Sequence, residues 1–278
     1  MKYIQIYEKY DIIYFDMKTK ILFWNLHKKE LSNLIIDVAQ EQDVDILVFA
    51  EFQNLDIDHV LTTLKEYTYI PPIESKYKVI FIIKNSIKTH DFQNKNRYSL
   101  LQCNNNNFDF NIVGIHLQSQ FTDNDAEREE TIRRLLNDLS VYEKDNYNTI
   151  LIGDFNIEPY SDEMVKFNLF NAVMFKDIIE KDDIKEFDDN IYKRFYNPML
   201  SLISEETKTY GSHYYTKSKL LWNFLDQCII RKEMIKFFKE IAIIKKIKEI
   251  NLCKNDQPNE EISDHLPLVV LFEGESDG

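Results

Sequence analysis

The 278-residue chain contains few cysteines and no apolar run long enough to cross a bilayer. Cys103, Cys228 and Cys253 are widely separated and lack the C-x-x-C spacing of a structural zinc or redox site, so we interpret them as core or surface thiols. The absence of a long apolar run predicts that the chain has no membrane span. The chain also lacks a Pro/Gly/Ser-rich linker, an internal repeat or an abrupt change in hydrophobicity, which favours a single domain over residues 1–278.

A secretory signal is missing as well. The segment MKYIQIYEKYDIIYFDMK carries Glu8, Asp11 and Asp16 within its apolar stretch and has no small-residue cleavage site, so we expect cytoplasmic residence. Basic residues are outnumbered, because 34 Lys and Arg against 47 Asp and Glu give a net charge of −13. This balance argues against a general nucleic-acid binder, but a nuclease with a cationic groove on an acidic body remains compatible with it.

Strand-like and helix-like segments succeed one another along the chain. Segments rich in branched and aromatic residues predict strands at 21–26, 45–50, 78–83, 108–117, 148–155, 223–230 and 265–272. Apolar stripes that begin at Leu31 and at Ile132 follow the i, i+3, i+4, i+7 spacing of helices that pack on a sheet. The asparagines at 104–107 predict a hairpin loop. These patterns indicate a mixed fold of sheets and helices.

Polar side chains recur at the ends of the predicted strands. They are Asn25, Glu51, His116, Asp154, Asn156, Asp226, Asp264 and His265. Each one taken singly is better explained as a strand cap or a loop residue. Together, these carboxylates, histidines and amides predict an active site at one edge of stacked sheets.

Two runs carry a family resemblance. ILIGDFNIEP at 150–159 and ISDHLPLVV at 262–270 resemble the signature blocks of the endonuclease/exonuclease/phosphatase superfamily. The segments WNL, FAEFQ, GIHLQS and FLDQCII resemble its remaining blocks in the same order, at 24–26, 49–53, 114–119 and 224–230. The resemblance covers nearly the whole chain and implies a deoxyribonuclease I-like α+β fold, a two-layer sandwich of mostly antiparallel sheets flanked by helices.

The resemblance also implies a divalent metal, Mg²⁺ or Mn²⁺. Mg²⁺ prefers oxygen ligands, so Glu51 is the expected direct ligand, with Asn25 nearby and Asp264 joining them. The alternative for Glu51 is a surface glutamate after a strand, but a carboxylate directly behind the apolar run ILVFA is an awkward place for one.

Family members also suggest catalytic roles. The resemblance assigns the positioning or deprotonation of the attacking water to Asp154, and stabilisation of the phosphate to Asn156. A continuing strand would place both side chains on one face, whereas an Asx turn leading into Pro159 is the structural alternative, and geometry permits both readings.

For the histidines, the resemblance assigns proton transfer, or donation to the scissile phosphate, to His265. Asp226 matches the aspartate that orients this imidazole, and His116 matches a second histidine that hydrogen-bonds the phosphate. Taken alone, a histidine inside an apolar strand such as His116 is more often a satisfied core residue.

An arginine or tyrosine that contacts phosphate in the family has no clear match here, although Tyr77 and Arg97 lie in the right region. Arg128 is a further cation, but its acidic helical neighbours predict an ion-paired surface residue instead of a phosphate clamp.

Metal-dependent phosphodiester hydrolysis of DNA or RNA is the leading functional hypothesis. Tyr215, Lys217 and Lys219 mix aromatic and basic side chains that suit stacking on bases and contacts with phosphates, or equally a packing edge. The alternatives are a phosphatase or phosphodiesterase acting on a lipid head group or small molecule, and a catalytically inactive binding module. The sequence predicts no particular protein partner.

Two features weigh against those alternatives. Ile157, Glu158 and Pro159 replace the aromatic and basic residues that follow the G-D-F-N block in inositol polyphosphate phosphatases, which disfavours a phosphoinositide substrate. A binding module would have no reason to keep all the acidic, amide and histidine positions.

Overall fold

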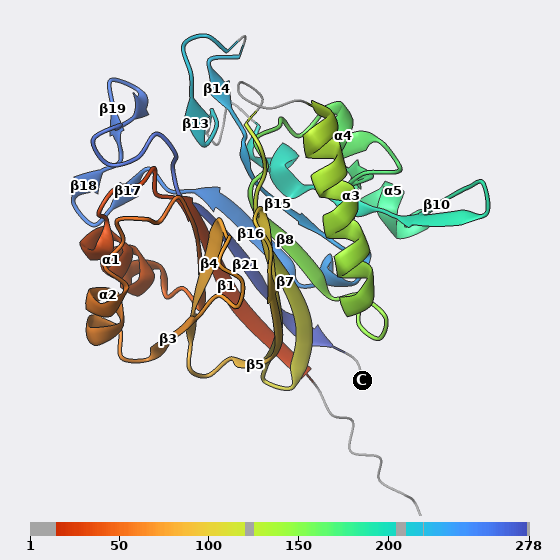
Figure 1. Cartoon of the computed structure of the whole chain (residues 1–278), viewed down its shortest axis with the longest axis horizontal. Helices are drawn as coiled ribbons and strands as arrows, with labels where there is room; N and C mark the ends of the chain where they lie inside the picture. The colour runs from red at the N-terminus through yellow and green to blue at the C-terminus, as the bar shows by residue number, and fades with distance from the viewer. Residues whose placement is uncertain (1–14, 120–124, 204–209, 219, 277–278) are drawn as a thin grey trace, which may run out of the picture.

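Two β-sheets pack face to face, with helices on their outer sides, in a computed structural model that describes residues 15–119, 125–203, 210–218 and 220–276 (Figure 1). The first sheet is six-stranded, and its order is β16 (Phe238–Ile243), β21 (Leu268–Ser276), β1 (Phe15–Asn25), β2 (Ile46–Ala50), β4 (Val79–Lys84) and β3 (Tyr67–Ile70). Neighbouring strands of this sheet run antiparallel except for the parallel pair β1 and β2.

The second sheet is seven-stranded. Its order is β5 (Lys88–Asn94), β6 (Tyr98–Asn105), β7 (Phe108–His116), β8 (Thr149–Asp154), β15 (Asp226–Ile230), β12 (Phe195–Tyr196) and β9 (Ala172–Val173). The pairs β7–β8 and β9–β12 are parallel, and the other pairs are antiparallel.

Helices flank both sides of the sandwich (Figure 1). They are α1 (Ser32–Gln42), α2 (Ile57–Thr63), α3 (Asp125–Tyr142), α4 (Asp162–Val165) and α5 (Lys176–Lys181), with 3-10 turns η1 (Pro198–Leu202) and η2 (Lys232–Met234). Four small hairpins complete the described chain: β10 (Ile184–Phe187) with β11 (Asn190–Lys193), β13 (His213–Tyr214) with β14 (Trp222–Asn223), β17 (Lys246–Ile247) with β18 (Ile250–Asn251), and β19 (Cys253–Lys254) with β20 (Gln257–Pro258). None of the described helices is both long and apolar enough to cross a bilayer.

Strand β8 shows how alternation builds two apolar layers. Ile150 and Ile152 lie in the core between the sheets, whereas Leu151 packs in a second cluster with Ile132 and Leu139 of α3. Because successive side chains of a strand point to opposite faces, a strand buried on both faces must be apolar throughout. This explains why the predicted strand segments lack a polar alternation.

The topology brings the polar strand ends to one end of the sandwich. Asn25 of β1 is paired with Ala50 of β2, so Glu51 follows directly beside it. In the other sheet the last residue of β7, His116, is paired with Asp154, the last residue of β8. Asp226 opens the antiparallel β15 opposite Asp154. Parallel strands end together and an antiparallel neighbour begins there, so these side chains share one edge.

The structure confirms the α+β sandwich, and each predicted strand segment contains a strand, but three of the predicted bounds are wrong. The first strand begins at Phe15 and not at residue 21, and the segment 223–230 is divided between β14 and β15. The last strand begins at Leu268 and not at His265. The backbone N–H of Leu266 donates to Ser212 O, and Pro267 has no N–H to give, so the residues before Leu268 leave the main ladder. A hairpin turn is confirmed between β6 and β7, where Asn106 and Asn107 take left-handed φ values of 50° and 65°, but it is shorter than the predicted loop at 104–107, because Asn104 and Asn105 belong to β6.

Arg128 is ion-paired as expected, but the prediction that it lies on the surface is wrong. Its side chain is buried, and its guanidinium contacts Asp125 and Glu163, each at 2.6 Å. A buried, paired guanidinium cannot reach a substrate, so Arg128 joins α3 to the segment before β9 instead.

Candidate active site

Asp154 lies at the centre of the polar strand ends. Asn25 Nδ2 donates to Asp154 Oδ2 at 3.1 Å and so links the ends of the two sheets. His116 Nε2 lies 3.7 Å and His265 Nε2 lies 4.0 Å from the same oxygen. Burial is the main reason that the pKa of Asp154 rises to about 7; the Asp226 carboxylate adds to it, while His265 and the Asn25 hydrogen bond oppose it. Asp154 therefore titrates near neutral pH.

His265 and Asp226 form a buried pair. His265 Nδ1 lies 2.7 Å from Asp226 Oδ2. The backbone of His265 is fixed on both sides, since Trp24 Nε1 donates to its carbonyl at 2.9 Å and its own N–H donates to Ser263 Oγ at 3.1 Å. Burial alone would lower the pKa of His265, but the carboxylates of Asp226, Asp154 and Asp264 outweigh it and raise the pKa to about 10. At neutral pH this ring is an imidazolium whose Nε2–H faces the site.

His116 is a neutral counterpart. Its side chain is buried, and Nε2 lies 3.8 Å from Glu51 Oε1 as well as near Asp154. Burial, with a smaller contribution from the Arg97 guanidinium, lowers the pKa of His116 to about 3. Its Nδ1 is buried and has no hydrogen-bond partner among the described residues. A neutral imidazole donates a hydrogen bond from only one of its nitrogens.

Glu51 sits in a left-handed backbone conformation, with φ at 48°. This region costs a non-glycine residue roughly 1 kcal/mol or more and is enriched at functional sites. The backbone N–H of Lys28 donates to Glu51 O at 2.8 Å, and Lys28 Nζ lies 3.9 Å from Glu51 Oε2. The carboxylate remains partly exposed at the mouth of the site.

Asp264 is flanked by two histidines that sequence reasoning did not place in the site. His27 Nδ1 lies 3.1 Å from Asp264 Oδ1, and His213 Nε2 lies 3.9 Å from Asp264 Oδ2. The rings of His213 and His265 have centroids 4.6 Å apart. Burial, helped by the charge of His265, lowers the pKa of His213 to about 4, so this ring is neutral. His27 follows the WNL block directly, so its place in the sequence could have indicated that it lies near the site. No sequence feature marks His213, because the site residues that it approaches are remote in sequence.

Asn156 is held by a turn and not by a continuing strand. Strand β8 ends at Asp154, whose Oδ1 accepts from the N–H of Asn156 at 2.9 Å, and Asn156 takes φ 54°. The Asx turn is therefore present. Asn156 Nδ2 donates to Leu117 O at 3.1 Å, which leaves one amide N–H for another partner.

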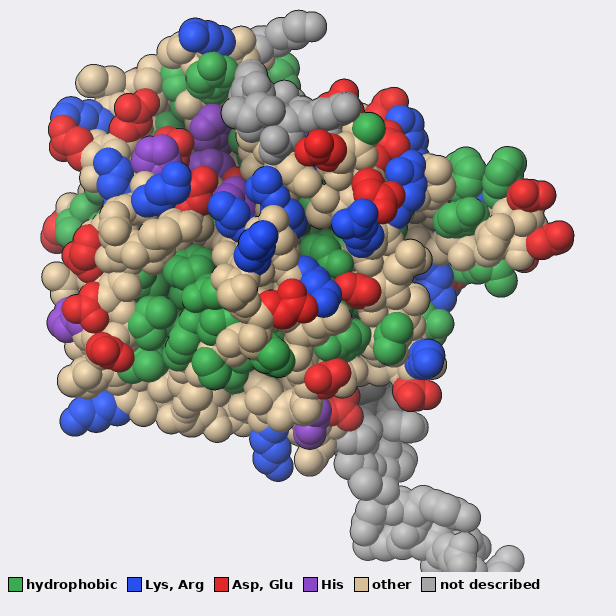
Figure 2. Space-filling view, viewed as in Figure 1, with side chains coloured by type: hydrophobic (Ala, Val, Ile, Leu, Met, Phe, Trp, Pro, Cys, Tyr) green, Lys and Arg blue, Asp and Glu red, His purple; other side chains and the backbone are tan. Residues whose placement is uncertain are grey.

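The predicted substrate-binding residues lie further out. Lys217 is exposed, and Tyr215 is half-buried with its ring 6.4 Å from that of His213. Lys219 lies outside the described residues. Arg97, which lies in the region expected for the phosphate-contacting residue of the family, is close enough to lower the pKa of His116. Lys78 and Lys28, which the sequence did not place near the site, have the same effect on that pKa. In Figure 2, histidines lie among Lys, Arg, Asp and Glu side chains at the upper part of the face shown.

The site residues fit a hard divalent metal. Glu51, Asp154 and Asp264 supply carboxylate oxygens, and the described site contains no cysteine. The buried Oδ1 atoms of Asp226 and Asp264 have no hydrogen-bond partner in the described part of the chain. Asn25 Oδ1 accepts from the N–H of His27 at 3.0 Å, which leaves it one further lone pair for a ligand. Oxygen donors of this kind suit Mg²⁺ or Mn²⁺.

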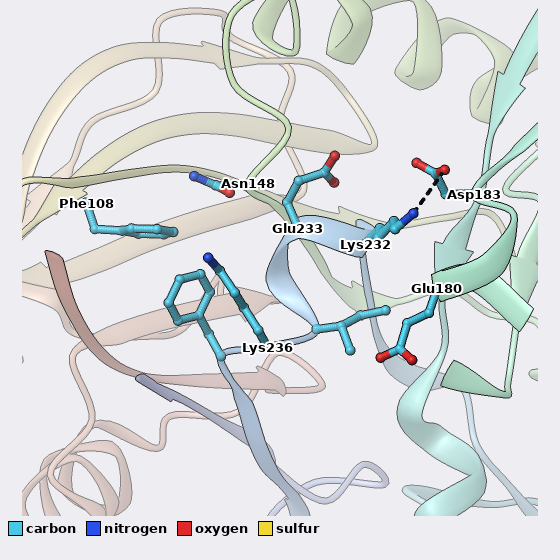
Figure 3. Close-up of a pocket in the computed structure, with 9 residues that line it drawn as sticks. Phe108, Asn148, Glu180, Asp183, Lys232, Glu233 and Lys236 are labelled. Carbon is cyan, nitrogen blue, oxygen red and sulfur yellow. Dashed lines mark hydrogen bonds and ion pairs between the residues drawn. The ribbon is translucent and has the colours of Figure 1, made fainter. Parts of the chain in front are cut away.

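A separate hollow lies at the opposite ends of the same strands (Figure 3). Phe108 at the start of β7, Asn148 before β8 and Lys232 after β15 line it, and Lys232 pairs with Asp183 at 3.4 Å. This hollow shares no residue with the polar strand ends.

A two-layer sandwich that carries carboxylates, amides and a histidine–aspartate pair at one end defines a hydrolytic class of protein. The sequence profile of the Endonuclease/Exonuclease/phosphatase family matches residues 22–234, so the chain belongs to this family of phosphoesterases, which are generally dependent on divalent metals.

Solved structures share the fold at low sequence identity. An AP endonuclease from Archaeoglobus fulgidus is 13% identical, with a TM-score of 0.57 over 91% of this chain and 99% of that chain. The mannosyl-6-phosphatase Bt3783 of Bacteroides thetaiotaomicron is 12% identical, with a TM-score of 0.57 over 91% and 99%. D. rerio TDP2 complexed with single strand DNA product is 14% identical, with a TM-score of 0.55 over 93% and 100%. A comparison with proteins of curated function found no match.

Proposed function

We propose that the chain is a divalent-metal-dependent phosphodiesterase that cleaves DNA or RNA. The observation that carries the reaction type is the buried Asp154 carboxylate, whose pKa lies near 7, set 4.0 Å from the Nε2 of a cationic His265. A base that titrates near neutral pH beside a fixed cation suits attack of water on a phosphate ester.

Glu51 is the proposed principal metal ligand, with the oxygens of Asn25 and Asp264 beside it. When bound, Mg²⁺ or Mn²⁺ supplies positive charge that polarises the phosphoryl group and offsets the charge that develops on it. The left-handed backbone of Glu51 and the orphaned Asp264 oxygen support this assignment.

Residues of the chain accept the proton of the attacking water and stabilise the charge on the phosphate. Asp154 accepts a proton from the attacking water while the water oxygen bonds to phosphorus and the ester oxygen departs. The Nε2–H of His265 donates to a phosphate oxygen, and Asp226 keeps that ring charged and oriented. His116 and the second amide N–H of Asn156 donate to the phosphate as neutral groups, which fixes its position.

Nucleic acid as the substrate is supported by the surroundings of the site. Lys28, Lys78 and Arg97 place positive charge around His116, where the backbone phosphates of a polymer would lie. Tyr215 and Lys217 on the β13–β14 segment add an aromatic face and an exposed ammonium. One similar structure holds a single strand DNA product.

A compact phosphate ester is the second candidate, and the net charge of −13 favours it because an acidic body repels a polyanion. To decide, the purified chain is incubated with Mg²⁺ or Mn²⁺ and single- and double-stranded DNA, RNA, a simple phosphodiester and a simple monoester. The Asp154→Asn variant serves as the matched control. We expect cleavage of a nucleic acid that the variant lacks. Cleavage of the simple esters alone would overturn the nuclease assignment, and no metal-dependent activity on any substrate would overturn the reaction type.

A further inference from the structure

The β10–β11 hairpin projects from the sandwich (Figure 1) and carries exposed apolar side chains (Figure 2). Phe187 is 55% exposed and Ile191 is 65% exposed. The hairpin is nevertheless fixed on the body, because the Phe167 ring packs on Phe187 and on Tyr192, with centroids 4.9 Å and 5.1 Å away. A fixed arm loses little conformational freedom when it binds, so it can serve as a contact surface for a partner.

The outer edge of β11 directs backbone groups away from the hairpin. In the described part of the chain, β11 pairs with β10 alone. In an antiparallel pair, successive residues direct their N–H and C=O groups alternately to the partner strand and away from it. Arg194 N donates to Asp183 O across the hairpin at 2.8 Å, so the groups of Lys193 and Ile191 point outward. Lys193 O agrees with this alternation, because it accepts from Arg231 Nη1 at 2.9 Å.

Space for a further strand lies beside this edge. A hollow of about 690 Å³ is lined by residues 191–193 of β11 and by Leu136 and Asn137 of α3. An extended segment that adds to an exposed sheet edge gains backbone hydrogen bonds along its length. An edge strand with such groups is a template for pairing with another chain.

The sequence of β11 fits a second copy of itself. When two antiparallel strands of one sheet are related by a two-fold axis, some residue lies opposite its own copy, because residues directly opposite each other must point to the same face. With Ile191 at that position, its N–H donates to Ile191 O of the second copy and the reverse, and two apolar side chains meet. Two residues further on, Lys193 lies opposite Asp189 of the second copy, which is exposed on the turn of the hairpin. Opposite charges placed in this way stabilise a sheet.

The outer edge of β10 is not self-complementary. Glu186 lies opposite Ile191 in the hairpin, so its backbone groups also point outward. A two-fold axis at this position would set Glu186 against its own copy, and like charges directly opposite each other destabilise a sheet. Pairing with a second copy is therefore expected at β11.

We propose that two copies of the chain associate through their β11 strands, about a two-fold axis at Ile191. The two hairpins then form one four-stranded antiparallel sheet. A contact limited to two hairpins is small, and interfaces below about 1,200 Å² are typical of weak, reversible complexes. This association does not depend on the proposed hydrolysis.

The test is sedimentation equilibrium of the full chain from about 1 to about 500 µM, in about 0.15 M salt to screen the repulsion between acidic bodies. We expect a reversible equilibrium between monomer and dimer. Ile191→Pro removes the central N–H and with it both symmetric hydrogen bonds, so the Kd of the dimer should rise at least about tenfold. Glu186→Pro is the matched control, because it removes the outward N–H of the opposite residue in the same hairpin, and it should leave the Kd unchanged.

Charge variants test the register without proline. Asp189→Lys should weaken association, and the double variant Asp189→Lys with Lys193→Glu should restore it, because the two charges are exchanged. A monomer at every concentration would overturn the proposal and leave the β11 edge to an extended segment of a different protein. A dimer that Ile191→Pro leaves unchanged, or that Glu186→Pro weakens equally, would also overturn it. Failure of the double variant to restore association would overturn the register at Ile191.

Discussion

The pairing of Asp226 with His265 leads to a prediction about how kcat/KM falls at alkaline pH. Asp226→Asn preserves the size of the side chain but removes the carboxylate 2.7 Å from His265 Nδ1. Burial lowers the pKa of His265, and the substitution removes the negative charge that mainly opposes this effect. An opposite charge within about 4 to 6 Å is worth about 1 to 3 pKa units, so we expect the pKa of His265 to fall from about 10 to about 8.

The consequence depends on pH. His265 is active when protonated, so activity is present below its pKa and is lost as pH rises through it. At pH 9 a ring with a pKa near 10 is about nine-tenths protonated, and one with a pKa near 8 is about one-tenth protonated, so kcat/KM should fall about ninefold further at pH 9 than at pH 7. His265→Ala removes the donor itself and should cost 10²- to 10³-fold at pH values where the ring of the parent is protonated.

The assay is kcat/KM against pH for the parent, Asp226→Asn and His265→Ala on the substrate found by the screen. Asp177→Asn, a carboxylate on α5 away from the polar strand ends, provides the charge control. Thermal unfolding of each variant checks that the fold persists. If the alkaline limb of Asp226→Asn coincided with that of the parent, the assignment of His265 as a charge-held donor would be wrong.

Three further changes test other parts of the structure. A chelator should abolish activity, and Mg²⁺ or Mn²⁺ should restore it. Glu51→Gln should raise the metal concentration that activity requires, at an unchanged melting temperature. Full activity in excess chelator would contradict the proposed dependence on a metal. In the parent, activity should rise with pH through about 7, because the Asp154 base is active when deprotonated. Asp154→Asn should lower kcat by about 10²- to 10⁴-fold and abolish this rise. A variant that keeps the rise would show that another group titrates. Gly114→Ala should lower the free energy of unfolding by about 1 to 3 kcal/mol, measured in urea. The added Cβ would lie 2.5 Å from Val79 Cγ1 and 2.9 Å from Val48 Cγ1, between the packed sheets. Unchanged stability would mean that the sheets can separate there.

The strands that build the site were predictable because they are buried on both faces. Apolar runs such as ILVFA and TILIG can be identified as strands from the sequence alone, without knowledge of the strands they pair with. The polar residues that end these runs lie at the strand ends. β5, with the sequence KTHDFQN, is mostly exposed and shows no apolar alternation, so no pattern of residues predicts this strand. The same holds for the two-residue hairpin strands, whose pairing depends on tertiary contacts.

The site was predictable only in part, for a related reason. Asp154, Asp226 and His265 lie in blocks that a resemblance can match, and the folded chain brings them together. Their roles remain predictions. Lys78 and Lys28 lie outside the matched blocks, and Arg97 lies only in the region where the phosphate-contacting residue of the family is expected. The fold brings all three cations near His116. A linear sequence alone does not show which cations gather around the same side chain.

His213 shows how a hairpin can add a side chain to the surroundings of a matched block. The S-D-H block supplies Asp264 and His265, and the resemblance alone places Asp264 beside Glu51 as an oxygen ligand. The β13–β14 hairpin then sets His213 against this block through the bridge to His265, and His27, in a left-handed turn, brings a second imidazole to 3.1 Å from Asp264. The two imidazoles next to Asp264 therefore come from residues outside the family blocks, and only the folded chain brings them to this carboxylate.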